Sequence, residues 1–122
     1  MQRREILQTI LAGLLLAVPA LAGQTLGPRA DAIAAKALKE SRESKLEDLL
    51  EEASALQAEG RTQGVKGATT DMLSQLHKLV YARLMLVRLE KMKENAAQIP
   101  GYRRKVEDAE RAYRSARAKV KA

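Results

Sequence analysis

The order of apolar and polar residues after position 28 is helical. One apolar stripe consists of Leu46, Leu49, Leu50, Ala53 and Leu56. This spacing predicts an amphipathic helix. Pro28 suits a first helical turn because it lacks an N–H that needs a partner, and Gly60 is a stop signal. We therefore expect one long helix from about Pro28 to Glu59.

A broader apolar pattern follows a glycine-rich loop. Residues 60–69 hold three glycines and no hydrophobic period, so this loop is the candidate hinge. Thr69 or Thr70 caps a helix that we expect to continue to about Gln98. Its apolar residues are Leu73, Leu76, Leu79, Val80, Leu84, Met85, Leu86, Val87, Leu89 and Met92. This breadth predicts a central helix that packs against the others or against a partner.

The last segment has the narrowest apolar seam. Its apolar residues, spaced alternately four and three apart, are Tyr102, Val106, Ala109, Tyr113, Ala116 and Val120. This is an a/d heptad register, and it predicts a helix from Tyr102 to about Val120. The break at Pro100-Gly101 favours an antiparallel hairpin with the central helix. The predicted fold is all-α, a small antiparallel bundle or hairpin of about three long helices.

The first 22 residues have the layout of an export signal. Arg3 and Arg4 precede a mostly apolar run, and Ala20-Leu21-Ala22 places small residues where a signal peptidase cuts. Arg-Arg two residues before Ile-Leu is similar to a twin-arginine signal. The alternative is a retained membrane anchor, since a spanning helix needs about 20 residues. Residues 23–122 then form one helical domain with its glycine-rich loop at 60–69.

Composition excludes several kinds of site. The chain has no Cys, Phe or Trp, which rules out disulfides, thiolate metal sites and cysteine nucleophiles. Without residues 1–22, about 100 residues remain, enough for one small domain. A core of Leu and Ala with few aromatic residues is thin, so we expect modest stability that a partner increases.

Catalytic motifs are nearly absent. His77 is the only histidine, so it has no second imidazole with which to share a metal. Ser74 lies three residues before His77, without an evident third member of a triad. The glycine-rich loop does not have the spacing of a phosphate-binding loop. We expect no catalytic residues, no metal site, no cofactor and no enzymatic activity.

Charge is unevenly distributed. Residues 46–59 contain five acidic residues and no Lys or Arg, whereas the last helix and its tail are strongly basic. One interpretation is that these are solvated faces, with loose pairing between the acidic and the basic helix. The other is a surface that docks on an acidic protein face or anionic lipid. Its candidate residues are Arg103, Arg104, Arg111, Arg114, Arg117 and Lys121. Nucleic acid is a weaker alternative, because this helix has no Asn or Gln to read base edges.

A resemblance to a known family follows from this layout. A cysteine-free helical domain rich in Leu, Ala and Lys follows the signal, which has Arg3-Arg4 near its start and Ala20-Leu21-Ala22 at its end. The domain contains the run of Ala109, Tyr113 and Ala116. Together they resemble the extrinsic lumenal subunits of photosystems, nearest to the Q-type subunits of photosystem II. Those subunits are four-helix bundles, whereas the pattern here predicts three helices after the signal.

Two function classes follow. The resemblance implies a non-catalytic structural subunit in the thylakoid lumen, associated with the membrane, that stabilises a photosystem or bridges it to antenna proteins. Its partners would be the other subunits of the membrane complex. The alternative is a free helical binding or chaperone-like module of the lumen or of a bacterial periplasm, whose exposed Leu/Met surface holds apolar clients.

Overall fold

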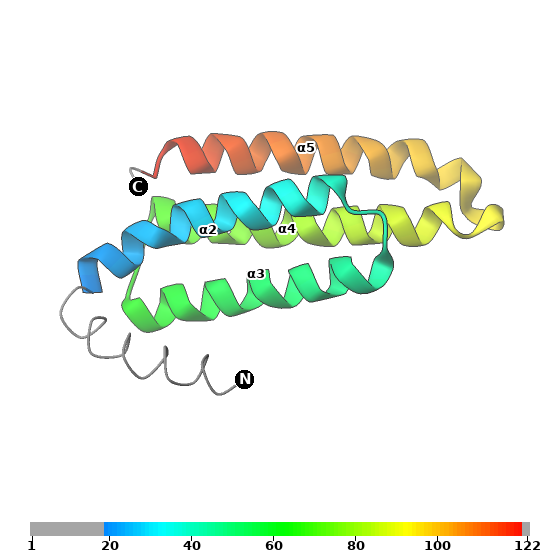
Figure 1. Cartoon of the computed structure of the whole chain (residues 1–122). Helices are drawn as coiled ribbons and strands as arrows, with labels where there is room; N and C mark the ends of the chain where they lie inside the picture. Colours follow the sequence, from blue (N-terminus) through cyan, green and yellow to red (C-terminus); the bar gives the residue numbers. More distant parts are fainter. Residues whose placement is uncertain (1–18, 121–122) are drawn as a thin grey trace, which may run out of the picture.

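Four α-helices, each antiparallel to the one before it, make up most of residues 19–120, the part of the chain that this computed structural model describes (Figure 1). They are α2 (Pro19–Lys39), α3 (Glu43–Gln63), α4 (Ala68–Glu90) and α5 (Ile99–Ala118), with the 3-10 helix η1 (Lys93–Gln98) before α5. Side chains are described from Leu26 onward, except at positions 93 and 95. The predicted signal residues Arg3 and Arg4 lie outside the described residues, as do the side chains of Ala20 and Ala22.

The central position of α4 is confirmed. It packs against α2, α3 and α5, and the stripe from Leu73 to Val87 is buried. The other predicted stripes are buried too, through Leu46 and Leu56 in α3 and Val106 in α5. The core is made mainly of Leu, Ala and Val side chains. Tyr113 is the single aromatic member among the described buried residues, so the core has the Leu- and Ala-rich, aromatic-poor make-up that the composition predicts.

The all-α class is confirmed, but the prediction of three helices is wrong because the expected helix from Pro28 to Glu59 is two helices. The chain turns back between Lys39 and Glu43. At this turn the Glu40 carboxylate accepts hydrogen bonds from the backbone N–H groups of Ser41 and Arg42, at 3.1 and 3.0 Å. Two antiparallel helices bury both of their apolar faces against α4, which a single rod of this length would not do.

The Arg83 side chain of α4 fixes this turn. Its guanidinium donates two hydrogen bonds to the backbone carbonyl oxygen of Glu40, at 3.1 and 2.7 Å. The turn has neither glycine nor proline, so the usual sequence signals for a break are missing. A contact between residues distant in the sequence therefore stabilises a helix end that local pattern does not reveal.

The glycine-rich loop is shorter than predicted. α3 continues through Gly60 to Gln63 and ends at Gly64, whose φ of 74° is left-handed, as glycine allows. Gly60 instead permits close packing, because a Cβ there would lie 2.8 Å from Leu73 Cδ1 of α4. The non-helical connection is limited to residues 64–67.

The end of α4 also differs from the prediction. α4 ends at Glu90 rather than near Gln98, and η1 leads directly into α5. Pro100 and Gly101 lie in the first turn of α5, where proline is tolerated because the N–H that it lacks has no helical partner there. No helix of the described part is both long enough and apolar enough to cross a membrane.

Candidate docking surface

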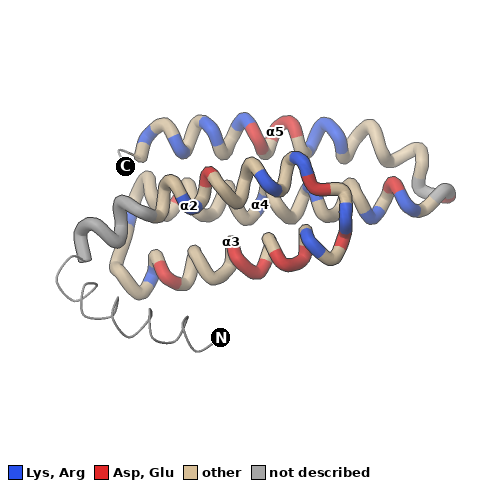
Figure 2. Tube along the Cα trace, viewed as in Figure 1, with Lys and Arg blue, Asp and Glu red and all other residues tan. Residues whose placement is uncertain are grey.

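The seam of α5 holds the helix against the bundle and leaves its other faces in water. Val106, Tyr113 and Ala116 are buried, and Tyr102 and Ala109 are partly buried. The predicted a/d register is thus confirmed. Lys and Arg residues recur along the length of α5, with fewer acidic residues among them (Figure 2). Within residues 99–120 there are seven Lys or Arg and three Asp or Glu.

Four of the predicted docking residues are exposed on α5: Arg103, Arg104, Arg111 and Arg114. We call these four residues the α5 basic face. Three of them form ion pairs within the chain. Arg103 lies 3.5 Å from the Glu90 carboxylate of α4, Arg111 pairs with Asp108, and Arg114 pairs with Glu110. Because the three arginine side chains are 63–73% exposed, each pair contributes only about 0–1 kcal/mol and is exchangeable for a partner's carboxylate.

Arg117 is not part of that face. Its side chain is 22% exposed, and its Nε lies 3.0 Å from the Asp31 carboxylate of α2. The Tyr113 hydroxyl donates a hydrogen bond to the same carboxylate at 2.7 Å. Burial and this hydrogen bond raise the pKa of Tyr113. Arg117 therefore joins α5 to α2, and the sixth predicted residue, Lys121, lies outside the described residues.

One cation near the face was not among the predicted docking residues. Lys105 Nζ lies 4.4 Å from the centroid of the Tyr102 ring, a distance at which a cation is attracted to an aromatic face. Tyr102 and Lys105 are three residues apart, so the helical spacing was a signal that could have revealed this pair.

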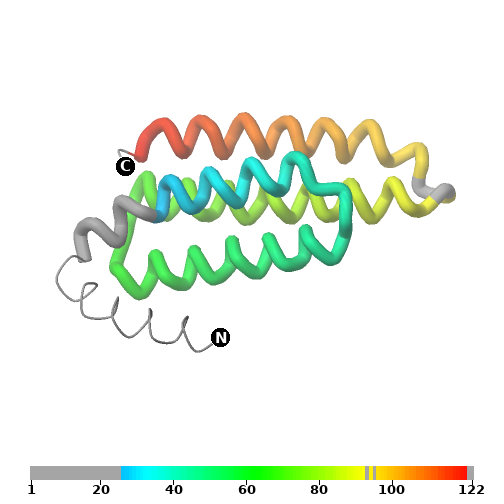
Figure 3. Tube along the Cα trace, viewed as in Figure 1, coloured from blue at the N-terminus to red at the C-terminus, as the bar shows by residue number. Residues whose placement is uncertain are grey.

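The acidic residues of α3 lie on a different side of the bundle. α3 and α5 flank α4 on different sides (Figure 3). The ion pairs of the described residues join α3 to α2 and to α4, through Arg29 and Arg88, and none joins α3 to α5. The pairing of the acidic with the basic helix, which one interpretation of the charge pattern included, is therefore not seen among the described residues.

These α3 pairs join neighbouring helices of the bundle. Arg29 binds both carboxylate oxygens of Glu59, at 2.6 and 2.9 Å, and Arg88 binds Glu43 and Glu47 at 2.7 and 2.8 Å. The arginine partner lowers the pKa of Glu59 and of Glu43. A general acid needs a raised carboxyl pKa, so the shifts at these groups are opposite to what acid catalysis requires.

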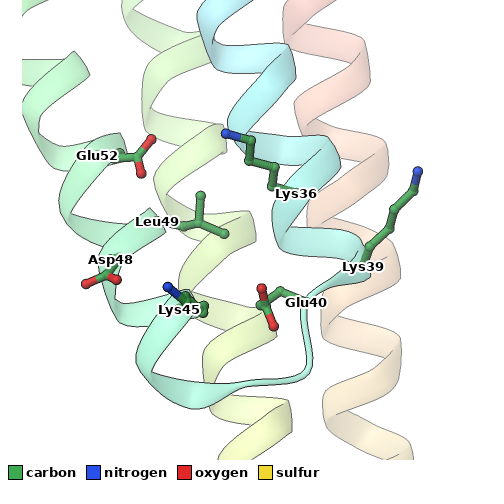
Figure 4. Close-up of a pocket in the computed structure, with 7 residues that line it drawn as sticks. All are labelled: Lys36, Lys39, Glu40, Lys45, Asp48, Leu49 and Glu52. Carbon is green, nitrogen blue, oxygen red and sulfur yellow. The ribbon is translucent and has the colours of Figure 1, made fainter.

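Two surface grooves have similar volumes. The groove between α2 and α3 measures about 420 Å³ (Figure 4) and is lined by Lys36, Lys39, Glu40, Lys45, Asp48, Leu49 and Glu52. Charged side chains of both signs surround it, so it offers a solvated polar surface. The groove between α2 and α5 measures about 410 Å³, and Leu79 and Tyr113 line it beside the Asp31–Arg117 pair.

Few side chains suited to metal binding or catalysis lie close together in the described part of the chain. No group of three His, Cys, Asp or Glu side chains close enough to hold a metal ion occurs in the described part of the chain. His77 is partly exposed on α4, with Ser74 one turn before it. The clearest feature of the surface is thus the charge of α5.

Comparisons of the chain with protein-family models, with curated proteins and with solved structures find no match.

Proposed function

We propose that this protein is a non-catalytic structural subunit that docks through the α5 basic face onto an acidic surface of a membrane protein complex. The observation that carries the proposal is the exposed row of arginines on a helix whose opposite side is packed onto α4. A rigid helix presents these guanidinium groups in a fixed array, and such an array steers and orients an acidic partner.

The exposed pairs of α5 support a role in recognition over one in stability. Arg111 and Arg114 each pair with a carboxylate on the same helix, within one turn. Such pairs contribute about 0.3–0.5 kcal/mol, so the fold does not depend on them. A partner's carboxylates replace Asp108 and Glu110 at small cost, and guanidinium groups suit bidentate binding of carboxylates.

A photosystem is the complex that we propose, on its lumenal side, with the protein stabilising it or bridging it to antenna proteins. The support is the resemblance carried by Arg3-Arg4, Ala20-Leu21-Ala22 and the α5 seam, together with the four-helix bundle that this resemblance implies. The corresponding location is the thylakoid lumen at the membrane surface, and a bacterial periplasm is the alternative.

The alternative proposal, a chaperone-like module, has less support. It relied on a broad apolar face of α4, but Leu76, Leu79 and Leu84 of that face are at most 2% exposed. The packed helices leave exposed only two large hydrophobic side chains among the described residues, Tyr81 and Met92. Tyr81 lies in α4 and Met92 follows that helix, and an extended client would need a continuous surface.

The test is binding of purified protein to salt-washed native membranes. We expect the double variant Arg111→Gln/Arg114→Gln to leave the membranes at lower salt than the unaltered chain, with unchanged helicity. The matched control is Lys36→Gln/Lys78→Gln, which removes two exposed cations elsewhere. Equal retention of both variants, or failure of any large complex to co-purify with the chain, would refute docking through α5.

A further inference from the structure

The hairpin between α4 and α5 reaches past the rest of the bundle. The end of α4, η1 and the start of α5 extend beyond the turn that joins α2 to α3 (Figure 1). η1 packs against α4 and α5, and near its start Lys91 lies 3.7 Å from the Glu43 carboxylate of α3. We call residues 89–105 the hairpin tip.

Apolar groups gather on the hairpin tip. Met92 is 46% exposed, and it is followed by the exposed Ala96, Ala97 and Pro100. Leu89 and Ile99 are partly buried, and Ile99 packs against the core. Met92 is one of two large hydrophobic side chains that are exposed among the described residues, and its unbranched, flexible side chain can adapt to an irregular apolar environment.

Cations surround this apolar group. The described cations of the hairpin tip are Lys91, Arg103, Arg104 and Lys105, and its described acidic residues are Glu90 and Glu94. Arg103 and Arg104 are exposed on the first turns of α5, while Lys105 extends over the Tyr102 ring. Apolar side chains with Lys, Arg and Tyr around them are the composition of segments that lie at a bilayer surface.

We infer that the hairpin tip contacts an anionic lipid bilayer, with Met92 in the headgroup region and the surrounding cations against lipid phosphates. Each Lys or Arg near an anionic surface adds to the electrostatic attraction, and the buried methionine adds an apolar contribution. This contact requires no protein partner, so it goes beyond the proposed function. It would hold α4 and α5 end-on to the membrane and divide the α5 basic face, with Arg103 and Arg104 against lipid and Arg111 and Arg114 available to a neighbouring protein.

A local probe tests this contact on the full chain. Because the chain has no cysteine, Met92→Cys takes a single environment-sensitive fluorophore. The matched control is Tyr81→Cys, at the second large hydrophobic residue that is exposed in the described part of the chain, 49% against 46% for Met92. We expect vesicles with phosphatidylglycerol to shift the emission of the probe at 92 to the blue, and spin-labelled lipid to quench it. The probe at 81 should not respond.

The local readout separates the hairpin tip from the N-terminal segment. If residues 1–22 alone attach the chain to vesicles, the protein sediments with lipid while the probe at 92 stays unchanged, which overturns the inference. Equal responses at 92 and 81, or equal responses on neutral phosphatidylcholine vesicles, overturn it too. A probe at 92 that responds only to native membranes that contain protein would assign the hairpin tip to a protein partner instead.

A charge variant gives a second measurement. Arg103→Gln/Arg104→Gln/Lys105→Gln should raise the lipid concentration for half-maximal response at 92 by on the order of 10- to 100-fold. Lys36→Gln/Lys39→Gln/Lys78→Gln removes the same charge elsewhere and should change it much less. Equal effects of both triple variants would mean that net charge alone attracts the protein. Arg111→Gln/Arg114→Gln should preserve vesicle binding, so failure here and failure of the proposed function are distinguishable.

Discussion

The Tyr113 hydroxyl of α5 donates a hydrogen bond of 2.7 Å to the Asp31 carboxylate of α2. The two residues are 82 positions apart in the sequence, and the contact joins the first and last described α-helices. Arg117 binds the same carboxylate from the next turn of α5. One aspartate thus receives a phenol and a guanidinium, and α5 is held in place along α2 as well as along α4.

Tyr113→Phe should keep the seam of α5 but remove its hydrogen bond, lowering the free energy of unfolding by about 1 kcal/mol. Tyr113→Asp should cost about 3–5 kcal/mol, because it places a carboxylate at a buried position beside Asp31. Urea unfolding followed by circular dichroism measures both. The control is Tyr81→Phe on the exposed side of α4, which should change little. An Asp variant as stable as the Phe variant would contradict the burial of this position.

Arg117→Gln should destabilise the protein more than Arg111→Gln does, although both remove one arginine of α5. Arg117 is largely buried and bound to another helix, so we expect a loss of about 1 kcal/mol. Arg111 pairs within its own exposed turn, and its replacement should stay within about 0.5 kcal/mol. Thermal unfolding of the two variants side by side makes the comparison. Equal melting temperatures of the two variants would mean that the contact of Arg117 with Asp31 does not stabilise the fold.

Gly60→Ala should destabilise the bundle even though alanine favours a helix by about 1 kcal/mol. The added methyl group would lie 2.8 Å from Leu73 Cδ1 and 3.0 Å from Val65 Cγ2. Leu73 is buried in the core and has little room to move, and overpacking of this kind costs about 1–3 kcal/mol. The additional change Leu73→Val should restore part of the loss in urea unfolding.

A control for that variant exists on α5. Gly101 is helical and has no other side chain within 4 Å of the position that its Cβ would take. Gly101→Ala should therefore raise stability by about 0.5 kcal/mol. A stabilising Gly60→Ala variant would show that α3 and α4 approach less closely than described.

Stability should fall in acid partly through Glu40. Hydrogen bonds from Arg42 lower the pKa of Glu40 from 4.5 to about 2. Because the folded-state pKa is the lower one, the contribution of Glu40 is fully present above about pH 4.5 and is lost as the pH falls toward 2. Glu40→Gln should therefore flatten the dependence of melting temperature on pH in this window. Glu51→Gln, at an exposed α3 position, should leave the pH dependence of the melting temperature unchanged. The same pH dependence for the unaltered chain and both variants would contradict this role of Glu40.

The periodicity of apolar residues determined the helical class, the inner faces of α3, α4 and α5, and the central place of α4. These predictions succeed because the buried residues, such as Leu76 and Val106, recur with the period of a helix, and this period is visible in the sequence. The charge of α5 was equally visible. The sequence did not show which of these cations are free to bind a partner protein. Arg114 pairs within α5, whereas Arg117 is bound by a carboxylate of another helix.

Helix ends are where local pattern failed. Gly60 and Pro100 are residue types that usually mark the end of a helix, yet both lie inside helices. The turn after Lys39 contains neither glycine nor proline. The sequence by itself determined that the chain forms amphipathic helices with a basic last segment, because side-chain period and composition act locally. Only the tertiary structure decided where the first long segment folds back, that α3 and α5 do not neutralise each other, and that Asp31 holds Tyr113 and Arg117. These contacts join residues distant in the sequence, and their free energy exists only when the helices are packed.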